Sequence, residues 1–129
     1  MTADRPRDRL GRPLPPDADP DSVAPTVPSI ADLDDPSVWR LALDLLDRGL
    51  PFHAHEVFEE RWRTAPAADR QAWRALAQWG AALTHDARGN DIGAARLAQR
   101  AMETLDSATA IPACIDAPAV RASCRALVG

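Results

Sequence analysis

The chain has 129 residues, a formal net charge of −4 and 46% hydrophobic residues, which suits one domain with a buried core. It contains no lysine and no tyrosine, which excludes Schiff-base lysines, lysine-dependent phosphate loops and tyrosine acid–base chemistry. No stretch approaches the roughly 18 uncharged apolar residues of a membrane span. No apolar segment typical of a signal peptide is visible near the N-terminus either. We therefore expect a cytoplasmic protein with no membrane partner.

The charges are unevenly placed along the chain. Residues 1–35 carry four arginines against eight aspartates, whereas residues 36–129 carry eleven arginines against eleven acidic residues. A neutral domain with an acidic tail lacks the basic surface that nucleic-acid binding requires. We expect no nucleic-acid partner, and an unidentified small molecule or protein as the partner instead.

The N-terminal tail, residues 1–30, is rich in proline and aspartate. Seven of the twelve prolines lie before residue 29, and large apolar side chains are scarce there. Such a segment buries too little surface to offset its loss of conformational entropy, so it is predicted to be disordered. The two cysteines, Cys114 and Cys124, are expected to be free and reduced.

A single domain over residues 35–128 is predicted to be all-α, a compact bundle of four to five short antiparallel helices. Asp35 followed by Pro36 favours a helix start, Gly49 a helix end, and Asp91 a further helix cap. The expected helices cover residues 36–48, 51–64, 67–88, 92–107 and 118–128. Connections of two to four residues would make neighbouring helices antiparallel.

Helical periodicity also predicts which residues face the core. The segment 36–48 is expected to bury Trp39, Leu43 and Leu46. The segment 92–107 is expected to bury Ile92, Ala95, Ala98, Met102 and Leu105. The segment 67–88 carries a stripe from Trp73 to Thr84, and its alanine and glycine content on several faces suits a central helix.

Chemistry-bearing residues gather in the segment 51–64, which reads FHAHEVFEERWR after Pro51. It holds three of the four glutamates of the chain and two of the three histidines. His55 and Glu59 are four residues apart, so their side chains can meet on a helix. Phe52, Trp62 and Arg63 fall within about 100° of this pair around the helix.

This segment, together with QWGAALTHDARGN and AARLAQRAMETL further on, resembles the domain-of-unknown-function 309 family over roughly residues 38–127. The resemblance rests on the spacing H-E-x-x-E-x-x-W, here His55, Glu56, Glu59 and Trp62, and on Phe52, Arg63, Gln78, His85 and Gly89-Asn90. It implies a small all-helical bundle in which Gln78 and His85 lie with the motif helix. Thr84 and the long acidic tail depart from the family pattern. The family has no established activity, so the resemblance implies no reaction.

Three hypotheses explain the cluster. In the first, His55, Glu59 and Arg63 form a network covered by Trp62, within a structural or ligand- or partner-binding module that needs no cofactor. In the second, His55, Glu59 and His85 bind Zn, Mn or Fe, with Glu56 as a base in a metal-dependent hydrolase. No second carboxylate-and-histidine motif is present to complete a di-metal bundle.

In the third hypothesis, the domain is a metal-free enzyme. His55 polarised by Glu59 would act as general base, and Gln78 and Arg63 would orient an anionic substrate. Whether the protein is an enzyme stays open, and a homodimer is compatible with an alanine-rich helical surface. The candidate site residues are Phe52, His55, Glu56, Glu59, Trp62, Arg63, Gln78 and His85.

Overall fold

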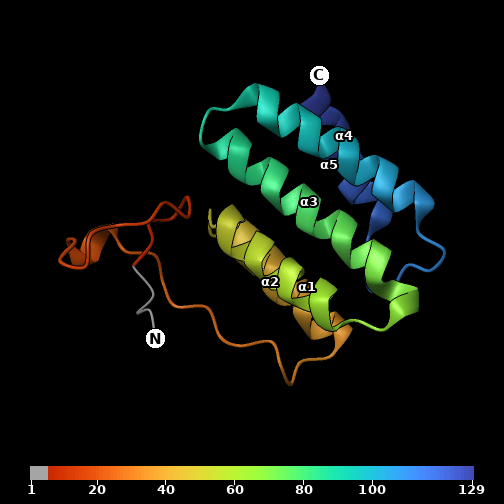
Figure 1. Ribbon diagram of the computed structural model, residues 1–129, viewed down its shortest axis with the longest axis horizontal. Helices are drawn as coiled ribbons and strands as arrows, with labels where there is room; N and C mark the ends of the chain where they lie inside the picture. Colours follow the sequence, from red (N-terminus) through yellow and green to blue (C-terminus); the bar gives the residue numbers. More distant parts are fainter. Residues whose placement is uncertain (1–5) are drawn as a thin grey trace.

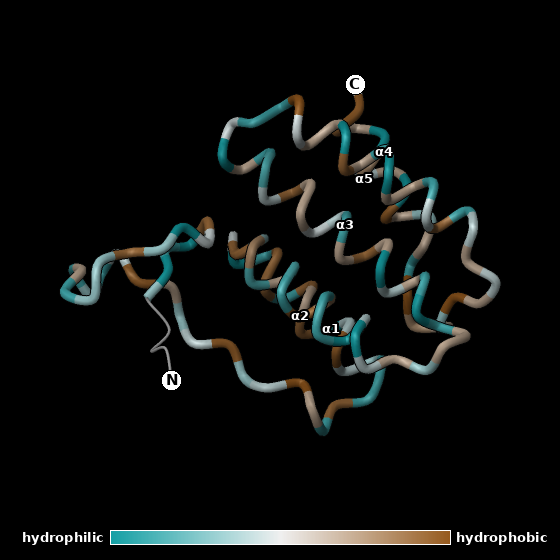
Figure 2. The backbone as a smooth tube through the Cα atoms, in the orientation of Figure 1, coloured by the Kyte–Doolittle hydropathy of each residue, from teal (hydrophilic) through white to brown (hydrophobic). Residues whose placement is uncertain are grey.

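The computed structural model describes residues 6–129, which form five α-helices and no strand (Figure 1). The helices are α1 (Asp35–Asp47), α2 (Pro51–Thr64), α3 (Arg70–Ala87), α4 (Asp91–Ser107) and α5 (Ala117–Val128), with 3-10 turns at Pro20–Ser22 and Ala67–Asp69. The all-α prediction is confirmed. Figure 2 shows hydrophobic and hydrophilic residues interspersed along every helix, as amphipathic packing requires.

Helix α3 is the centre of the bundle, with α1 and α2 on one side and α4 and α5 on the other (Figure 1). It is buried on most of its circumference because small residues let neighbouring helices approach from both sides. Trp39 of α1 and Trp73 and Trp79 of α3 are buried in the core of the bundle. Thr84 is buried as well. Its hydroxyl donates a hydrogen bond to the Gly80 carbonyl at 2.8 Å, so this buried polar group has a partner within the helix.

Helices α1, α4 and α5 begin one residue earlier than predicted, and α1 and α4 each begin at a pair of adjacent residues that can both cap a helix. Asp34, not Asp35, caps α1 by accepting a hydrogen bond from the Ser37 amide. Asn90, not Asp91, caps α4 by accepting from the Gly93 amide. In both pairs either side chain has the chemistry of a cap, so the sequence alone does not separate them.

The buried faces of α1 and α4 differ from the predicted faces. Helix α1 buries Val38, Trp39, Ala42 and Leu45, and leaves Leu43 and Leu46 half-buried. Helix α4 buries Ala94, Ala98, Ala101 and Leu105, and leaves Ile92 70% exposed and Ala95 and Met102 half-buried. An alanine-rich face allows α4 to lie close against α3. This face is therefore buried in place of the predicted face, which carries the larger isoleucine and methionine side chains.

The connections between helices are short except for the last. Residues 48–50, 65–69 and 88–90 join the first four helices, whereas nine residues, 108–116, join α4 to α5. The expectation of uniformly short links is therefore wrong at this point. Both cysteines are free as predicted, and burial raises the pKa of the Cys124 thiol to about 11.

The N-terminal segment from residue 6 contains one 3-10 turn and one isolated bridge between Arg7 and Pro13, but no α-helix or strand. Its first described residues lie beside the start of α2, after which the segment runs away from the bundle and returns to it at the start of α1 (Figure 1). Ile30 is buried in the core, and the segment from Arg7 to Gly11 contacts the ring of Phe52. The part of the predicted disordered tail at residues 1–5 lies outside the described residues.

Candidate functional site

The structure brings His55 and Glu59 together on α2, as their spacing predicts. The Nε2 atom of His55 lies 3.0 Å from Oε2 of Glu59, and its Nδ1 atom lies 3.7 Å from Oε1 of Glu56. The side chains of His55 and Glu59 are 20% and 31% exposed, so the pair is half-buried. Arg63 approaches the other oxygen of Glu59 at 3.5 Å, but it is 61% exposed and adds only about 0.3–0.5 kcal/mol.

A cleft of about 260 Å³ lies next to this pair, between α2, α3 and α4. It is lined by His55, Glu59, Trp62, Arg74, Ala77, Gln78, Ala81 and Leu97. The Oε1 atom of Gln78 is buried without a hydrogen-bond partner, which is costly unless a ligand or water supplies a donor. The guanidinium of Arg74 lies 5.7 Å from the Trp62 ring and forms one wall of the cleft.

Gly80 explains why His55 lies so close to α3. A Cβ atom on Gly80 would lie 2.9 Å from the Cα atom of His55 and 3.0 Å from its Cβ atom. The two helix backbones therefore approach each other at this residue, which only glycine permits. This approach places the His55–Glu59 pair against the face of α3 that carries Gln78.

A second, smaller cleft of about 130 Å³ opens on the other side of His55. It is lined by Phe52, His55, Ala81, Thr84, His85 and Arg88. His85 therefore lies near the motif helix, as the family resemblance implies, but in this second cleft and not beside Gln78. Its Nδ1 atom lies 2.9 Å from the Asn90 side-chain nitrogen.

The helix pattern predicts that Arg74 and Arg88 lie on a solvated face. Arg74 is exposed, with its guanidinium over the Trp62 ring, whereas Arg88 is half-buried against Phe52. Phe58 is fully buried among Trp39, Trp73 and Trp79.

One group in the described part of the chain could hold a metal ion. His55, Glu56 and Glu59 each place a ligand atom within 4.8 Å of the others. His85, a predicted third ligand, is not a member of this group, whereas Glu56 is. An imidazole nitrogen and two carboxylates suit Zn, Mn or Fe.

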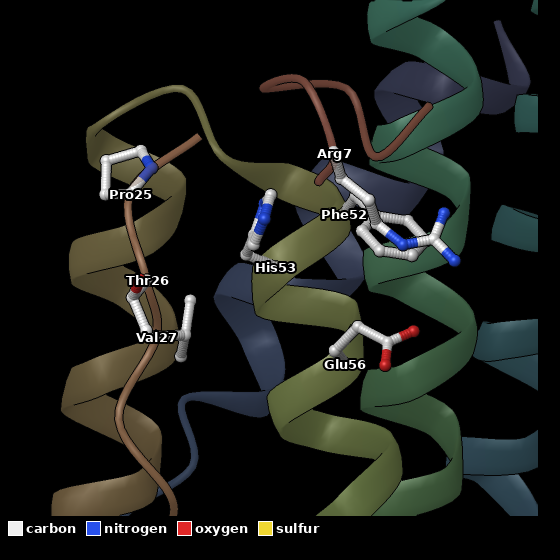
Figure 3. Close-up of a pocket in the computed structure, with 7 residues that line it drawn as sticks. All are labelled: Arg7, Pro25, Thr26, Val27, Phe52, His53 and Glu56. Atoms are coloured by element: carbon white, nitrogen blue, oxygen red, sulfur yellow. The ribbon is translucent and has the colours of Figure 1, made fainter. Parts of the chain in front are cut away.

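A third cavity, of about 440 Å³, lies between α2 and the N-terminal segment (Figure 3). Arg7 and residues 25–27 line it from the segment, and Phe52, His53 and Glu56 line it from α2. The Nδ1 atom of His53 is buried without a hydrogen-bond partner. Burial of this ring lowers the pKa of His53 below its ordinary value of 6.5.

The lowered pKa of His53 predicts a loss of stability in mild acid. As the pH falls below 6.5, the unfolded chain takes up a proton on this ring before the folded chain does, so the free energy of unfolding decreases. We expect that decrease to be smaller in His53→Gln, measured by urea unfolding at pH 7.5 and pH 5. An identical pH dependence in the wild type and the variant would show that the folded protein does not hold His53 in its neutral form.

Comparison with known protein families finds a match to one part of this helical bundle. Residues 39–97 match the family model described as Domain of unknown function (DUF309). The matched segment is similar to this family, and it contains every residue that lines the 260 Å³ cleft. No curated protein and no solved structure matches the chain significantly. Within residues 6–129, no helix combines the length and apolar character that a membrane crossing needs.

Proposed function

We propose that the domain binds a small polar ligand in the cleft between α2, α3 and α4. The observation that carries this proposal is the buried, unpartnered Oε1 atom of Gln78, a residue that lines the same cleft as the half-buried His55–Glu59 pair. A buried acceptor without a partner destabilises the free protein by about 1–3 kcal/mol, and a ligand that donates to it removes that cost. Trp62 offers a flat apolar surface beside these polar groups.

The ligand class follows from the groups that line the cleft. Glu59 and Gln78 present acceptor oxygens, whereas Trp62 stacks flat groups. A planar molecule that carries N–H donors, such as an amidine or an amide, complements both features. Arg74 lines the cleft with its guanidinium over the Trp62 ring.

A fragment screen by nuclear magnetic resonance tests the proposal, with benzamidine and benzamide as first probes. Binding should shift the indole N–H resonance of Trp62 and the side-chain amide resonance of Gln78. In Glu59→Gln the affinity for benzamidine should fall about tenfold, because a charge-assisted hydrogen bond becomes a neutral one. Glu103→Gln, on the exposed surface of α4, serves as the control and should bind as the wild type does. If no planar donor fragment perturbs Trp62 or Gln78, the proposal is wrong.

A second candidate function is divalent metal binding by His55, Glu56 and Glu59, favoured by the close grouping of their ligand atoms. Chelator-treated protein mixed with Zn²⁺, Mn²⁺ or Fe²⁺ should then show a raised Tm that Glu56→Gln removes. Glu56 does not line the 260 Å³ cleft, so this variant separates metal binding from fragment binding. An unchanged Tm with all three metals contradicts the metal hypothesis.

A further inference from the structure

Residues 7–11, which we call the strap, cover the end of the bundle where α2 begins. The guanidinium of Arg7 lies 5.0 Å from the centroid of the Phe52 ring (Figure 3). Gly11 packs on the same ring so closely that a Cβ atom on it would lie 2.0 Å from Cγ of Phe52. Arg7 also donates to the Gly11 carbonyl at 2.6 Å, which holds the strap in a tight turn. The strap lies outside the segment that matches the family model.

The strap uses a main-chain carbonyl to bind Arg88. The Nε and Nη2 atoms of Arg88 both donate to the carbonyl oxygen of Leu10, at 3.0 and 2.6 Å. Two parallel N–H groups on one guanidinium edge form the fork that binds a carboxylate or a phosphate. A neutral carbonyl presents one oxygen to that fork, so it satisfies the fork less well than an oxyanion does.

His85 supplies a second donor in the same cleft. Oδ1 of Asn90 accepts from the Gly93 amide at 3.0 Å as the cap of α4, and this bond fixes the orientation of the Asn90 amide. The Nδ2 group of Asn90 therefore donates to Nδ1 of His85 at 2.9 Å. Nδ1 of His85 is then the acceptor, so the ring proton is on Nε2, which can donate to a ligand. Gly93 permits this arrangement, since a Cβ atom there would lie 2.7 Å from Nδ2 of Asn90.

We propose that Arg88 and His85 form a binding site for a small oxyanion, a carboxylate or phosphate group, and that the strap occupies this site as an internal competitor. The oxyanion would take the place of the Leu10 carbonyl in the fork of Arg88. It would also receive the Nε2–H of His85 in the cleft that both residues line. The inference goes beyond the proposed function, because neither Arg88 nor His85 lines the 260 Å³ cleft.

Gly11→Ala releases the strap without shortening the chain. Gly11 has a φ of +79°, and its added methyl group would collide with the Phe52 ring. Gly49→Ala is the matched control, because Gly49 has a φ of +73° but a Cβ atom there meets nothing within 4 Å. Both variants share the backbone penalty, and only the first one expels the strap. Trypsin should therefore cleave after Arg7 and Arg9 faster in Gly11→Ala than in the wild type or Gly49→Ala.

Titration of the full chain with inorganic phosphate and with acetate, followed by the ring proton resonances of His85, tests the site. Gly11→Ala should bind the preferred anion about tenfold more tightly than the wild type and Gly49→Ala, because the competing strap is gone. Arg88→Gln in the Gly11→Ala background should lose this binding. Tighter binding of phosphate than of acetate would identify a phosphate-bearing ligand, and the reverse order a carboxylate-bearing one.

Three results would overturn the inference. If Gly11→Ala binds neither phosphate nor acetate, the proposed oxyanion site is wrong. If Gly11→Ala and the wild type bind the anion with equal affinity, the strap does not compete for the site. If trypsin cleaves both at the same rate, the strap does not pack on Phe52 as described. Each of these results leaves the fragment-binding test of the larger cleft unaffected.

Discussion

Replacing Gly80 with valine is expected to lower the free energy of unfolding by about 3 kcal/mol, the upper end of the range for overpacked cores. The contact that the new side chain meets is the backbone of His55, with its Cα atom at 2.9 Å and its amide nitrogen at 3.2 Å. A backbone cannot rotate aside as a flexible side chain can, so α2 and α3 must separate. Their separation would also move His55 and Glu59 away from Gln78.

Two further variants isolate the steric effect at this helix crossing. Gly80→Ala should cost less than Gly80→Val, because it adds one methyl group and gains about 1 kcal/mol of helix propensity. Ala87→Val at the exposed end of α3 measures the helix penalty of valine alone. Urea unfolding of the three variants provides the comparison. If Gly80→Val is no less stable than Ala87→Val, the close backbone approach at Gly80 is wrong.

Replacing Phe58 with alanine is expected to cost about 3–5 kcal/mol, the range found for large aromatic residues in cores. The ring of Phe58 is fully buried and lies 6.3, 6.4 and 6.0 Å from the rings of Trp39, Trp73 and Trp79. It connects α2 to both α1 and α3. The cavity left by its removal would loosen the helix that carries His55 and Glu59.

Phe52→Ala is the matched control, because Phe52 lies on the same helix but is half-buried. Its partners are rings and guanidinium groups at the edge of the bundle. We expect a smaller loss of stability than in Phe58→Ala, measured by the midpoint of thermal unfolding. An equal or larger loss would show that contacts with the strap, and not the aromatic core, set the orientation of α2.

The helices were predictable because their ends are marked by local chemistry. Pro51, Gly49 and Pro66 begin or end helices through their own backbone restrictions, which do not depend on the rest of the fold. The buried face of α4 was not predictable in this way. Ile92 is more hydrophobic than Ala94, yet Ala94 is buried, since the short distance between α3 and α4 selects small side chains.

The candidate site shows the same division between local and tertiary information. The meeting of His55 and Glu59 follows from helix geometry alone, and the resemblance to the family placed His85 near them. The contribution of Arg88 was missed, because its partners are Phe52 and the Leu10 carbonyl, from two distant parts of the chain. Gly93 carried a visible signal, a glycine inside a helix three residues after the capping residue, but only the fold shows what it contacts.

The placement of the four tryptophans gives the protein a built-in optical reporter. Trp39, Trp73 and Trp79 are at most 8% exposed, whereas Trp62 is half-buried and lines the 260 Å³ cleft. A collisional quencher such as acrylamide should therefore reach the emission of Trp62 before that of the other three indoles. A molecule seated in the cleft would shield that emission, so occupancy can be followed by fluorescence without any attached dye.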